Sequence, residues 1–211
     1  MSVFRPSAHA LITGGASGVG LAVARLCLSH SMRVTIIDAS QTSLAHAKAT
    51  LTGENTTFIH ADVSSRADWA TVKQRIGPAS VDLLMLNAGI GGKGTWGDES
   101  YFDEILATNL GGVVNGLNAF VPHFLQREKE GNNSPAAIVV TGSKQGITNP
   151  PGNAAYNASK AAVKTLTEHL SFDLKDTGVG VHLLVPGWTF TGLVSFCRLL
   201  LLLLFHGIQH C

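Results

Sequence analysis

Short apolar runs alternate along the chain with longer segments in which apolar residues recur at helical spacing. The apolar runs predict strands over residues 9–13, 33–38, 57–62, 81–87, 136–143 and 179–187. The segments between them predict helices over residues 21–30, 43–51 and 66–76, two helices spanning roughly 99–127, and a helix over about 154–175. Strands that are apolar almost throughout are typical of a parallel sheet covered by helices on both faces. The pattern therefore predicts an α/β fold, a Rossmann-like doubly wound parallel sheet of about six strands.

The composition agrees with such a fold and excludes some classes of partner. Of the 211 residues, 45% are apolar and 14% are charged, and the mean hydropathy is +0.23. A chain of this length and composition can bury a substantial core. The formal net charge is +1 and no run of Lys or Arg occurs, so we do not expect a nucleic-acid partner.

The cysteines and the N-terminus indicate a cellular location. Cys27, Cys197 and Cys211 are odd in number and lack metal-ligand spacing, which favours a reducing compartment over a disulfide framework. His206 and His210 lie close to Cys211, but histidine pairs of this spacing also arise by chance, and no metal is expected. The first residues lack the long apolar core of a signal peptide, so we expect a cytoplasmic protein.

A glycine-rich turn, TGGASGVG (residues 13–20), follows the first predicted strand. Its glycines, Gly14, Gly18 and Gly20, do not match the G-x-G-x-x-G spacing. They still permit a tight turn and a close approach of the backbone to a pyrophosphate, which would lie at the N-terminus of the next helix. A purely structural turn is the alternative, but the position between strand and helix favours phosphate binding.

Asp38 ends the second predicted strand, where a carboxylate can accept hydrogen bonds from an adenosine ribose. That carboxylate would repel a 2′-phosphate, and Ala39 and Ser40 supply no compensating cation. NAD is therefore the expected cofactor, with NADP as the alternative. Asp38 could instead be a helix N-cap or turn residue, and Asp62, which ends the third predicted strand, has the same ambiguity.

Tyr156 and Lys160 lie four residues apart in YNASK and share one face of a predicted helix. A nearby ammonium group stabilises a phenolate, which lets a tyrosine exchange a proton with a substrate. Ser143 lies thirteen residues before Tyr156, at the end of a predicted strand, and its hydroxyl could hold a substrate carbonyl. It could also be a simple strand-terminal cap. These groups all follow parallel strands, at the edge where open α/β sheets bind ligands.

Taken in order, the motifs resemble those of the classical short-chain dehydrogenase/reductase family. They are TGGASGVG, DV (62–63), NAGI (87–90), Asn109, Ser143, YNASK and PGWTFT (186–191), and they span about residues 8–194. The resemblance implies that Tyr156 is the general acid/base, that Ser143 orients the reacting oxygen, and that Lys160 assists the tyrosine and holds the nicotinamide ribose. Asn109 would anchor a water in the proton relay. The implied cofactor-binding residues are Gly14, Ser17, Gly18, Val19, Gly20, Asp38, Asp62, Val63, Asn87, Ala88, Gly89, Tyr156, Lys160, Pro186, Gly187, Thr189 and Thr191.

The chain ends in SFCRLLLLLLFHGIQHC (195–211), where members of that family continue with a substrate-covering helical segment and a last strand. We therefore expect a dinucleotide-binding domain over residues 1–194 that lacks the family's final strand, and an atypical Leu-rich tail over 195–211. A membrane anchor is not expected, because a spanning helix needs about 20 predominantly apolar residues. The segment 192–208 has 17 residues and includes Arg198 and His206.

The resemblance leaves two functions open. The first is an NAD(P)(H)-dependent oxidoreductase that interconverts an alcohol and a carbonyl on a small-molecule substrate. The second is a cofactor-binding protein whose substrate site is incomplete and whose catalysis is impaired. The resemblance also implies a homo-oligomer in which the helices that carry Asn109 and Tyr156 pair across an interface. Few charges occur in the loops beside the predicted site, so a neutral, partly apolar substrate is expected.

Overall fold

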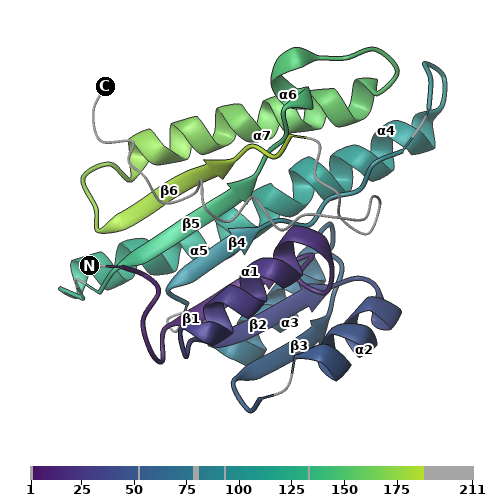
Figure 1. Cartoon of the computed structure of the whole chain (residues 1–211). Helices are drawn as coiled ribbons and strands as arrows, with labels where there is room; N and C mark the ends of the chain where they lie inside the picture. Colours follow the sequence, from purple (N-terminus) through teal and green to yellow (C-terminus); the bar gives the residue numbers. More distant parts are fainter. Residues whose placement is uncertain (1, 52, 78–80, 93, 133, 188–211) are drawn as a thin grey trace.

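The computed structural model of the chain describes residues 2–51, 53–77, 81–92, 94–132 and 134–187 (Figure 1). The predictions for Thr189, Thr191 and the Leu-rich tail (195–211) lie outside the described residues.

The described strands form one parallel sheet in the order β3-β2-β1-β4-β5-β6. Their bounds are β1 His9–Thr13, β2 Arg33–Asp38, β3 Thr56–His60, β4 Leu83–Leu86, β5 Ala136–Thr141 and β6 Val179–Leu184. The chain runs outward from β1 to β3 and then returns to the other side of β1 with β4. The strand order therefore reverses between β1 and β4, which is where open α/β sheets of this kind bind ligands.

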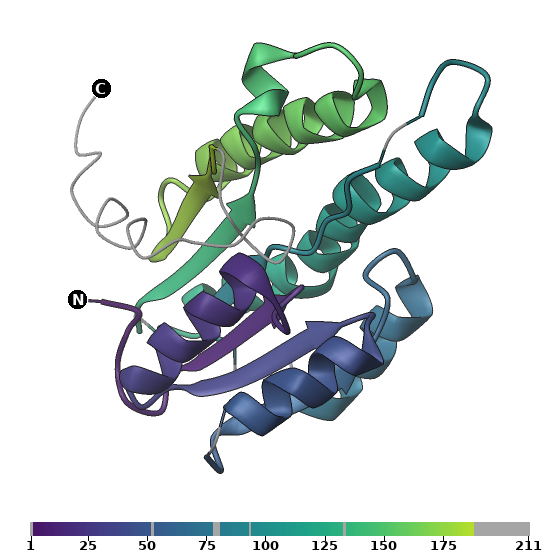
Figure 2. The same cartoon turned by 45° about the vertical axis from the view of Figure 1, so that its right-hand side comes forward.

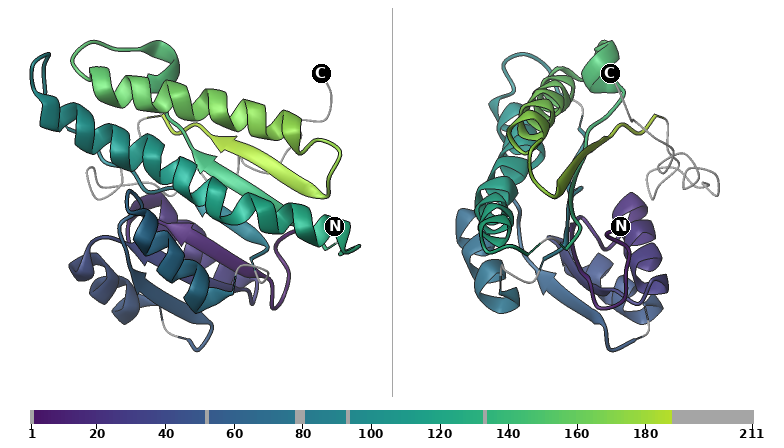
Figure 3. Two further views of the ribbon diagram at one scale, coloured as in Figure 1. Left: turned by 180° about the vertical axis from the view of Figure 1, so that it is seen from behind. Right: turned by 90° about the vertical axis from the view of Figure 1, so that its left-hand side faces the viewer.

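Helices cover both faces of the sheet, as the apolar strands predict (Figure 3). The helical elements are α1 Gly18–Ser29, α2 Gln41–Thr50, α3 Arg66–Ile76, α4 Glu99–Leu106, η2 Ala107–Gly111, α5 Gly112–Lys129, α6 Gln145–Thr148 and α7 Ala154–Asp173. Helices α1 and α2 lie on one face, while α3, α5 and α7 lie on the other. The doubly wound fold is therefore confirmed.

Alternation along the strands divides the core into two layers. In β1, Leu11 belongs to the cluster under α3, α5 and α7, whereas Ala10 and Ile12 belong to the cluster under α1 and α2. All three side chains are fully buried. Because successive side chains point to opposite faces, an unbroken apolar strand is what a sheet covered on both sides requires.

The segment from α4 to α5 contains the expected pair of helices. A π-helical turn, η2, joins α4 to α5 without an intervening loop, and the three elements run as one teal rod in Figure 2. π-helical turns insert an extra residue into a helix and occur often at functional sites. This one contains Asn109, whose side chain is completely buried.

One expectation about a strand end needs correction. Asp62 does not end the third strand: β3 ends at His60, and Asp62 lies in the following turn, where its carboxylate accepts hydrogen bonds from Ser64 N and Ser64 Oγ, both at 2.8 Å. The Pro- and Gly-rich segment after β5 contains the short helix α6.

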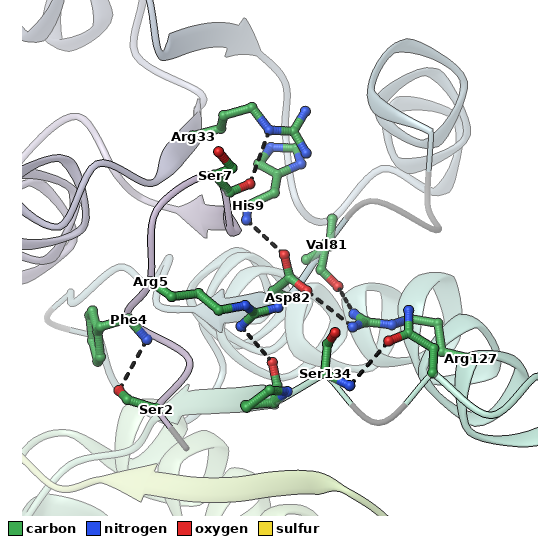
Figure 4. Close-up of polar contacts among 12 residues, drawn as sticks. Ser2, Phe4, Arg5, Ser7, His9, Arg33, Val81, Asp82, Arg127 and Ser134 are labelled. Carbon is green, nitrogen blue, oxygen red and sulfur yellow. Dashed lines mark hydrogen bonds and ion pairs between the residues drawn. The ribbon is translucent and has the colours of Figure 1, made fainter.

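An ion-pair network at the amino end of β4 connects the N-terminal segment of the chain to the sheet (Figure 4). The carboxylate of Asp82 accepts hydrogen bonds from Arg5 Nη2 at 3.0 Å, Arg127 Nη2 at 3.0 Å and His9 N at 2.9 Å. Arg127, near the end of α5, also donates to Val81 O at 2.8 Å. The network lies at the edge of the sheet opposite to the strand ends that face the cavity described below, so we assign it a role in stability.

Within the described ranges, no helix combines the length and the apolar character that a bilayer span demands.

Candidate active site

The carboxyl ends of the central strands border a cavity of about 580 Å³. Its walls come from the segments that follow β1, β2, β3, β4, β5 and β6, together with α7. The expected site residues that line it are Gly14, Ser17, Gly18, Val19, Asp38, Asp62, Val63, Asn87, Ala88, Gly89, Ser143, Tyr156, Lys160, Pro186 and Gly187. Gly20 and Asn109 are expected site residues that lie behind the cavity wall instead.

The glycine-rich turn packs tightly against the end of β4. Gly14 has a φ of +59°, which favours glycine, and a Cβ there would come within 2.9 Å of Ala88 Cα. A Cβ on Gly20 would overlap Gly14 O and approach Asn87 Nδ2 to 2.8 Å. Gly20 therefore supports the turn from behind rather than lining the cavity.

The N-terminus of α1 opens onto the cavity. Ser17 is its N-cap residue and makes no side-chain hydrogen bond to the helix. The first N–H groups of a helix have no partner within it, and they carry the positive end of the helix dipole. Because Ser17, Gly18 and Val19 line the cavity, this end of the cavity can bind an anion through main-chain N–H groups.

Asp38 is held at the edge of the cavity by two main-chain donors. Its carboxylate accepts hydrogen bonds from Ala16 N at 3.2 Å and from Ser40 N at 3.0 Å. These bonds leave lone pairs on both carboxylate oxygens for a ligand. Asp38 and Asp62 line this part of the cavity, and no Lys, Arg or His accompanies them there among the described lining residues.

Asn87 lines the cavity but uses its carboxamide to tie strand ends together. Nδ2 donates to Thr13 O and Gly14 O, each at 3.2 Å, and Oδ1 accepts from Thr141 Oγ1 at 3.1 Å. Both functional groups of the side chain are therefore occupied by β1, the glycine-rich turn and β5. Asn87 is a positioning residue that fixes the switch point of the sheet.

Tyr156 and Lys160 both face the cavity from α7. The Nζ of Lys160 lies 5.8 Å from the centre of the Tyr156 ring and donates to Thr141 O at 2.9 Å. The side chain of Lys160 is only 4% exposed, and burial lowers its pKa from 10.5 to about 8. A buried lysine without an acidic partner is rare, and a perturbed pKa in a cavity is typical of functional groups.

Ser143 follows β5 and lines the same part of the cavity as Tyr156. Its Oγ accepts a hydrogen bond from Gln145 N at 3.2 Å, at the start of α6. This bond occupies an acceptor position of the hydroxyl and leaves its proton free to be donated to a ligand.

Asn109 contributes to the site from beneath it. Oδ1 accepts from Ile90 N at 2.8 Å, while Nδ2 donates to Ile90 O at 2.9 Å and to Ser159 Oγ at 3.2 Å. The side chain therefore holds the segment after β4.

Several residues that hold this geometry were not predicted from the sequence. Thr13 Oγ1 accepts from Asn87 N at 2.9 Å and Ala88 N at 3.1 Å, and the buried Ser159 donates to Tyr156 O at 2.7 Å. Gln145 and Asn153 also line the cavity. Their positions next to the recognised motifs were the available signal, but their contacts link segments far apart in sequence and could not be read from spacing.

Comparisons with known proteins agree with this geometry. A family model described as short chain dehydrogenase matches residues 8–198. The 2-(S)-hydroxypropyl-CoM dehydrogenase 3 of Xanthobacter autotrophicus is 35% identical over 184 residues, which are 83% of this chain and 69% of that protein.

Solved structures of related proteins superpose on most of the chain. A short chain dehydrogenase/reductase from Burkholderia phymatum in complex with NAD has a TM-score of 0.82 and 35% identity, and the match covers 91% of this chain and 69% of that one. The 3-ketoacyl-(acyl-carrier-protein) reductase from Brucella melitensis, complexed with NADH, has a TM-score of 0.82 and 28% identity over 90% of this chain and 79% of that one. The chain belongs to the short-chain dehydrogenase family.

Proposed function

We propose that the protein is an NAD(H)-dependent oxidoreductase that interconverts an alcohol and a carbonyl, with Tyr156 as general acid/base. One observation carries the proposal: Ser143, Tyr156 and Lys160 line the same cavity as the glycine-rich turn and Asp38. The related dehydrogenases described above support this class of reaction.

The residues present fit a dinucleotide. The N-terminus of α1 offers N–H groups to a pyrophosphate, and glycines allow the turn before it to pack closely against the end of β4. Asp38 has free lone pairs for the hydroxyls of an adenosine ribose, and Ala61, Asp62 and Val63 form the adjoining wall. The same placement favours NAD over NADP, because the described lining offers two carboxylates and no cation to a 2′-phosphate.

Each catalytic residue has a separate task. When bound, the nicotinamide accepts or supplies the hydride. Tyr156 Oη exchanges the proton with the substrate oxygen, and Ser143 donates a hydrogen bond to that oxygen while its own oxygen is held by Gln145 N. The buried ammonium of Lys160 stabilises the phenolate form of Tyr156.

Further groups hold this arrangement in place. The bond from Lys160 Nζ to Thr141 O uses one of its three protons, so two remain for the cofactor ribose and for a proton relay. Asn109 would anchor a water at the end of that relay, and its own side chain is held by Ile90 and Ser159.

The two tyrosines of the chain provide a matched test. NADH binding is measured by fluorescence titration, and NADH oxidation is followed with a panel of neutral ketones and aldehydes. Tyr156→Phe should keep the NADH affinity and lower kcat by about 10²-fold or more. Tyr101→Phe should leave both unchanged, because Tyr101 does not line the cavity and its hydroxyl has no hydrogen-bond partner among the described residues. Its ring belongs to the cluster against which Tyr156 packs, and phenylalanine keeps that ring.

The panel also discriminates between the two functions. Wild-type protein that binds NADH but reduces no carbonyl on the panel would favour the cofactor-binding, catalytically impaired alternative. A Tyr156→Phe variant as active as wild type would refute the proposed role of the tyrosine.

A further inference from the structure

The carboxamide of Gln145 makes no hydrogen bond to the residues that the structure describes. Gln145 begins α6 and lines the cavity together with Ser143 and Tyr156. Its Oε1 is buried from solvent and has no hydrogen-bond partner among the described residues. An unpaired buried acceptor destabilises a fold unless a ligand or water satisfies it.

Two neighbouring carboxamides are used differently. Asn157 Nδ2 donates to Pro150 O at 2.7 Å and fixes the loop before α7. Its Oδ1 is also buried without a partner among the described residues, but Asn157 does not line the cavity. Asn153, oriented to satisfy its neighbours, donates from Nδ2 to Gly92 O at 3.0 Å and to Gly152 O at 3.2 Å. Both side chains therefore anchor loops around the cavity. The hydrogen bonds of the described residues assign no such structural role to the side chain of Gln145.

The position of Gln145 is fixed although its carboxamide is free. Gly146 packs so closely on α7 that a Cβ there would lie 2.5 Å from Lys160 C and 2.7 Å from Ala161 N. The main-chain N–H of Gln145 is bound to Ser143 Oγ. The backbone of α6 is thus held against α7, the helix that carries Tyr156 and Lys160. The terminal torsion of a glutamine has broad minima, so Oε1 can turn toward a ligand at little cost.

Resting on the proposed function, we propose that Gln145 selects substrates with a second hydrogen-bond donor next to the reacting carbon, as in a vicinal diol or an α-hydroxy ketone. Ser143 and Tyr156 bind the reacting oxygen, and Gln145 Oε1 accepts the hydrogen bond of the neighbouring hydroxyl. The rest of this end of the cavity includes Ile90, Gly91 and Asn153, and its described lining has no charged side chain besides Lys160. A neutral substrate fits such a lining.

The reaction balances without a further reagent. Oxidation of a vicinal diol breaks one C–H and one O–H bond, forms the C=O bond of the α-hydroxy ketone, passes the hydride to NAD⁺ and transfers the proton to Tyr156 Oη. The second hydroxyl is unchanged.

The test compares two substrates that differ in one hydroxyl. The kcat/KM of the wild-type protein with NAD⁺ is measured for trans-cyclohexane-1,2-diol and for cyclohexanol. We expect the diol to be preferred by about ten- to a hundredfold, the range that corresponds to leaving one buried polar group unpaired. Gln145→Met keeps the side-chain length and removes the acceptor. It should bring the ratio of the two kcat/KM values to about one. Its thermal stability should be equal to or above that of the wild type.

Thr148→Ala is the matched control, because Thr148 lies on the same short helix and is exposed. It should retain the wild-type preference. Equal kcat/KM values of the wild type for the two substrates, or an unchanged preference in a folded Gln145→Met variant, would overturn the role of Gln145 and leave the oxidoreductase function intact. If neither substrate is oxidised but ketones on the panel are reduced, the proposed diol substrate class is wrong. Failure on every substrate would overturn the proposed function itself.

Discussion

Replacing Lys160 with methionine should stabilise the protein at neutral pH while removing its proposed activity. The lysine is 4% exposed, and the described residues offer it no carboxylate, only the hydrogen bond to Thr141 O at 2.9 Å. Desolvation by burial lowers its pKa from 10.5 to about 8. Burying a cation without a carboxylate partner lowers the free energy of unfolding, a loss that proteins accept where the group serves catalysis.

The size and the sign of the effect follow from linkage between protonation and folding. Because the pKa of Lys160 is lower in the folded protein, the unfolded chain binds more protons between pH 8 and 10.5, and stability rises with pH across that window. Each pH unit between the two pKa values is worth about 1.4 kcal/mol, so protonated Lys160 costs the fold about 3 kcal/mol below pH 8. Losing the hydrogen bond to Thr141 O costs the variant about 1–2 kcal/mol. At pH 7, Lys160→Met should therefore be more stable by about 1–2 kcal/mol.

Urea unfolding at a series of pH values from 7 to 10.5 measures this difference in the free energy of unfolding. The advantage of Lys160→Met should shrink above pH 8 and reverse between about pH 9 and 10, while its kcat stays at least about 10²-fold below that of the wild type. Lys164→Met is the control one turn further along α7. Lys164 is 38% exposed and bound to Glu168 at 2.6 Å, so its loss should change stability by less than about 1 kcal/mol. A Lys160→Met variant that is less stable at pH 7, or a difference that does not depend on pH, would refute the reasoning.

Three further substitutions test other parts of the structure. Gly20→Ala should weaken NADH binding at least tenfold in a fluorescence titration, because its Cβ would overlap Gly14 O; unchanged affinity would contradict the role of the turn. Asp38→Ala should lower the ratio of NADPH to NADH dissociation constants about tenfold or more by removing the repulsive carboxylate; an unchanged ratio would count against Asp38 as the selector. Asp82→Asn should lower the free energy of unfolding by about 3 kcal/mol in urea, since it leaves the buried Arg127 without its anion, and should spare NADH affinity; a loss below about 1 kcal/mol would show that the network is dispensable.

Much of the fold could be predicted from the sequence because both faces of the sheet are buried. Such a sheet needs strands that are apolar throughout, and the runs at 9–13 and 33–38 match β1 and β2 to the residue. The helix predicted over 66–76 also has the observed bounds. The two helices predicted over roughly 99–127 correspond to α4 and α5, but hydrophobic periodicity did not reveal the π-helical turn between them.

Part of the candidate site could likewise be predicted from the sequence, and part could not. The order of the motifs placed Ser143, Tyr156 and Lys160 together, and the cavity contains all three. Their catalytic roles stay predictions until the tyrosine variants are measured. Asn87 lines the cavity, whereas Asn109 lies behind its wall. The hydrogen bonds of their carboxamides join segments far apart in sequence and could not be read from the motifs.

The sequence by itself determined the alternation of strands and helices, the glycine-rich turn and the Tyr-Lys spacing, because these depend on local sterics and on the period of each element. Only the tertiary structure decided which polar groups are occupied and which are free. It buries Lys160 without a carboxylate among its described neighbours, and it leaves Gln145 Oε1 unpaired beside the cavity. The physical reason is that desolvation and hydrogen-bond satisfaction depend on partners brought together by the packing of α6, α7 and the strand ends, and those partners are distant in sequence.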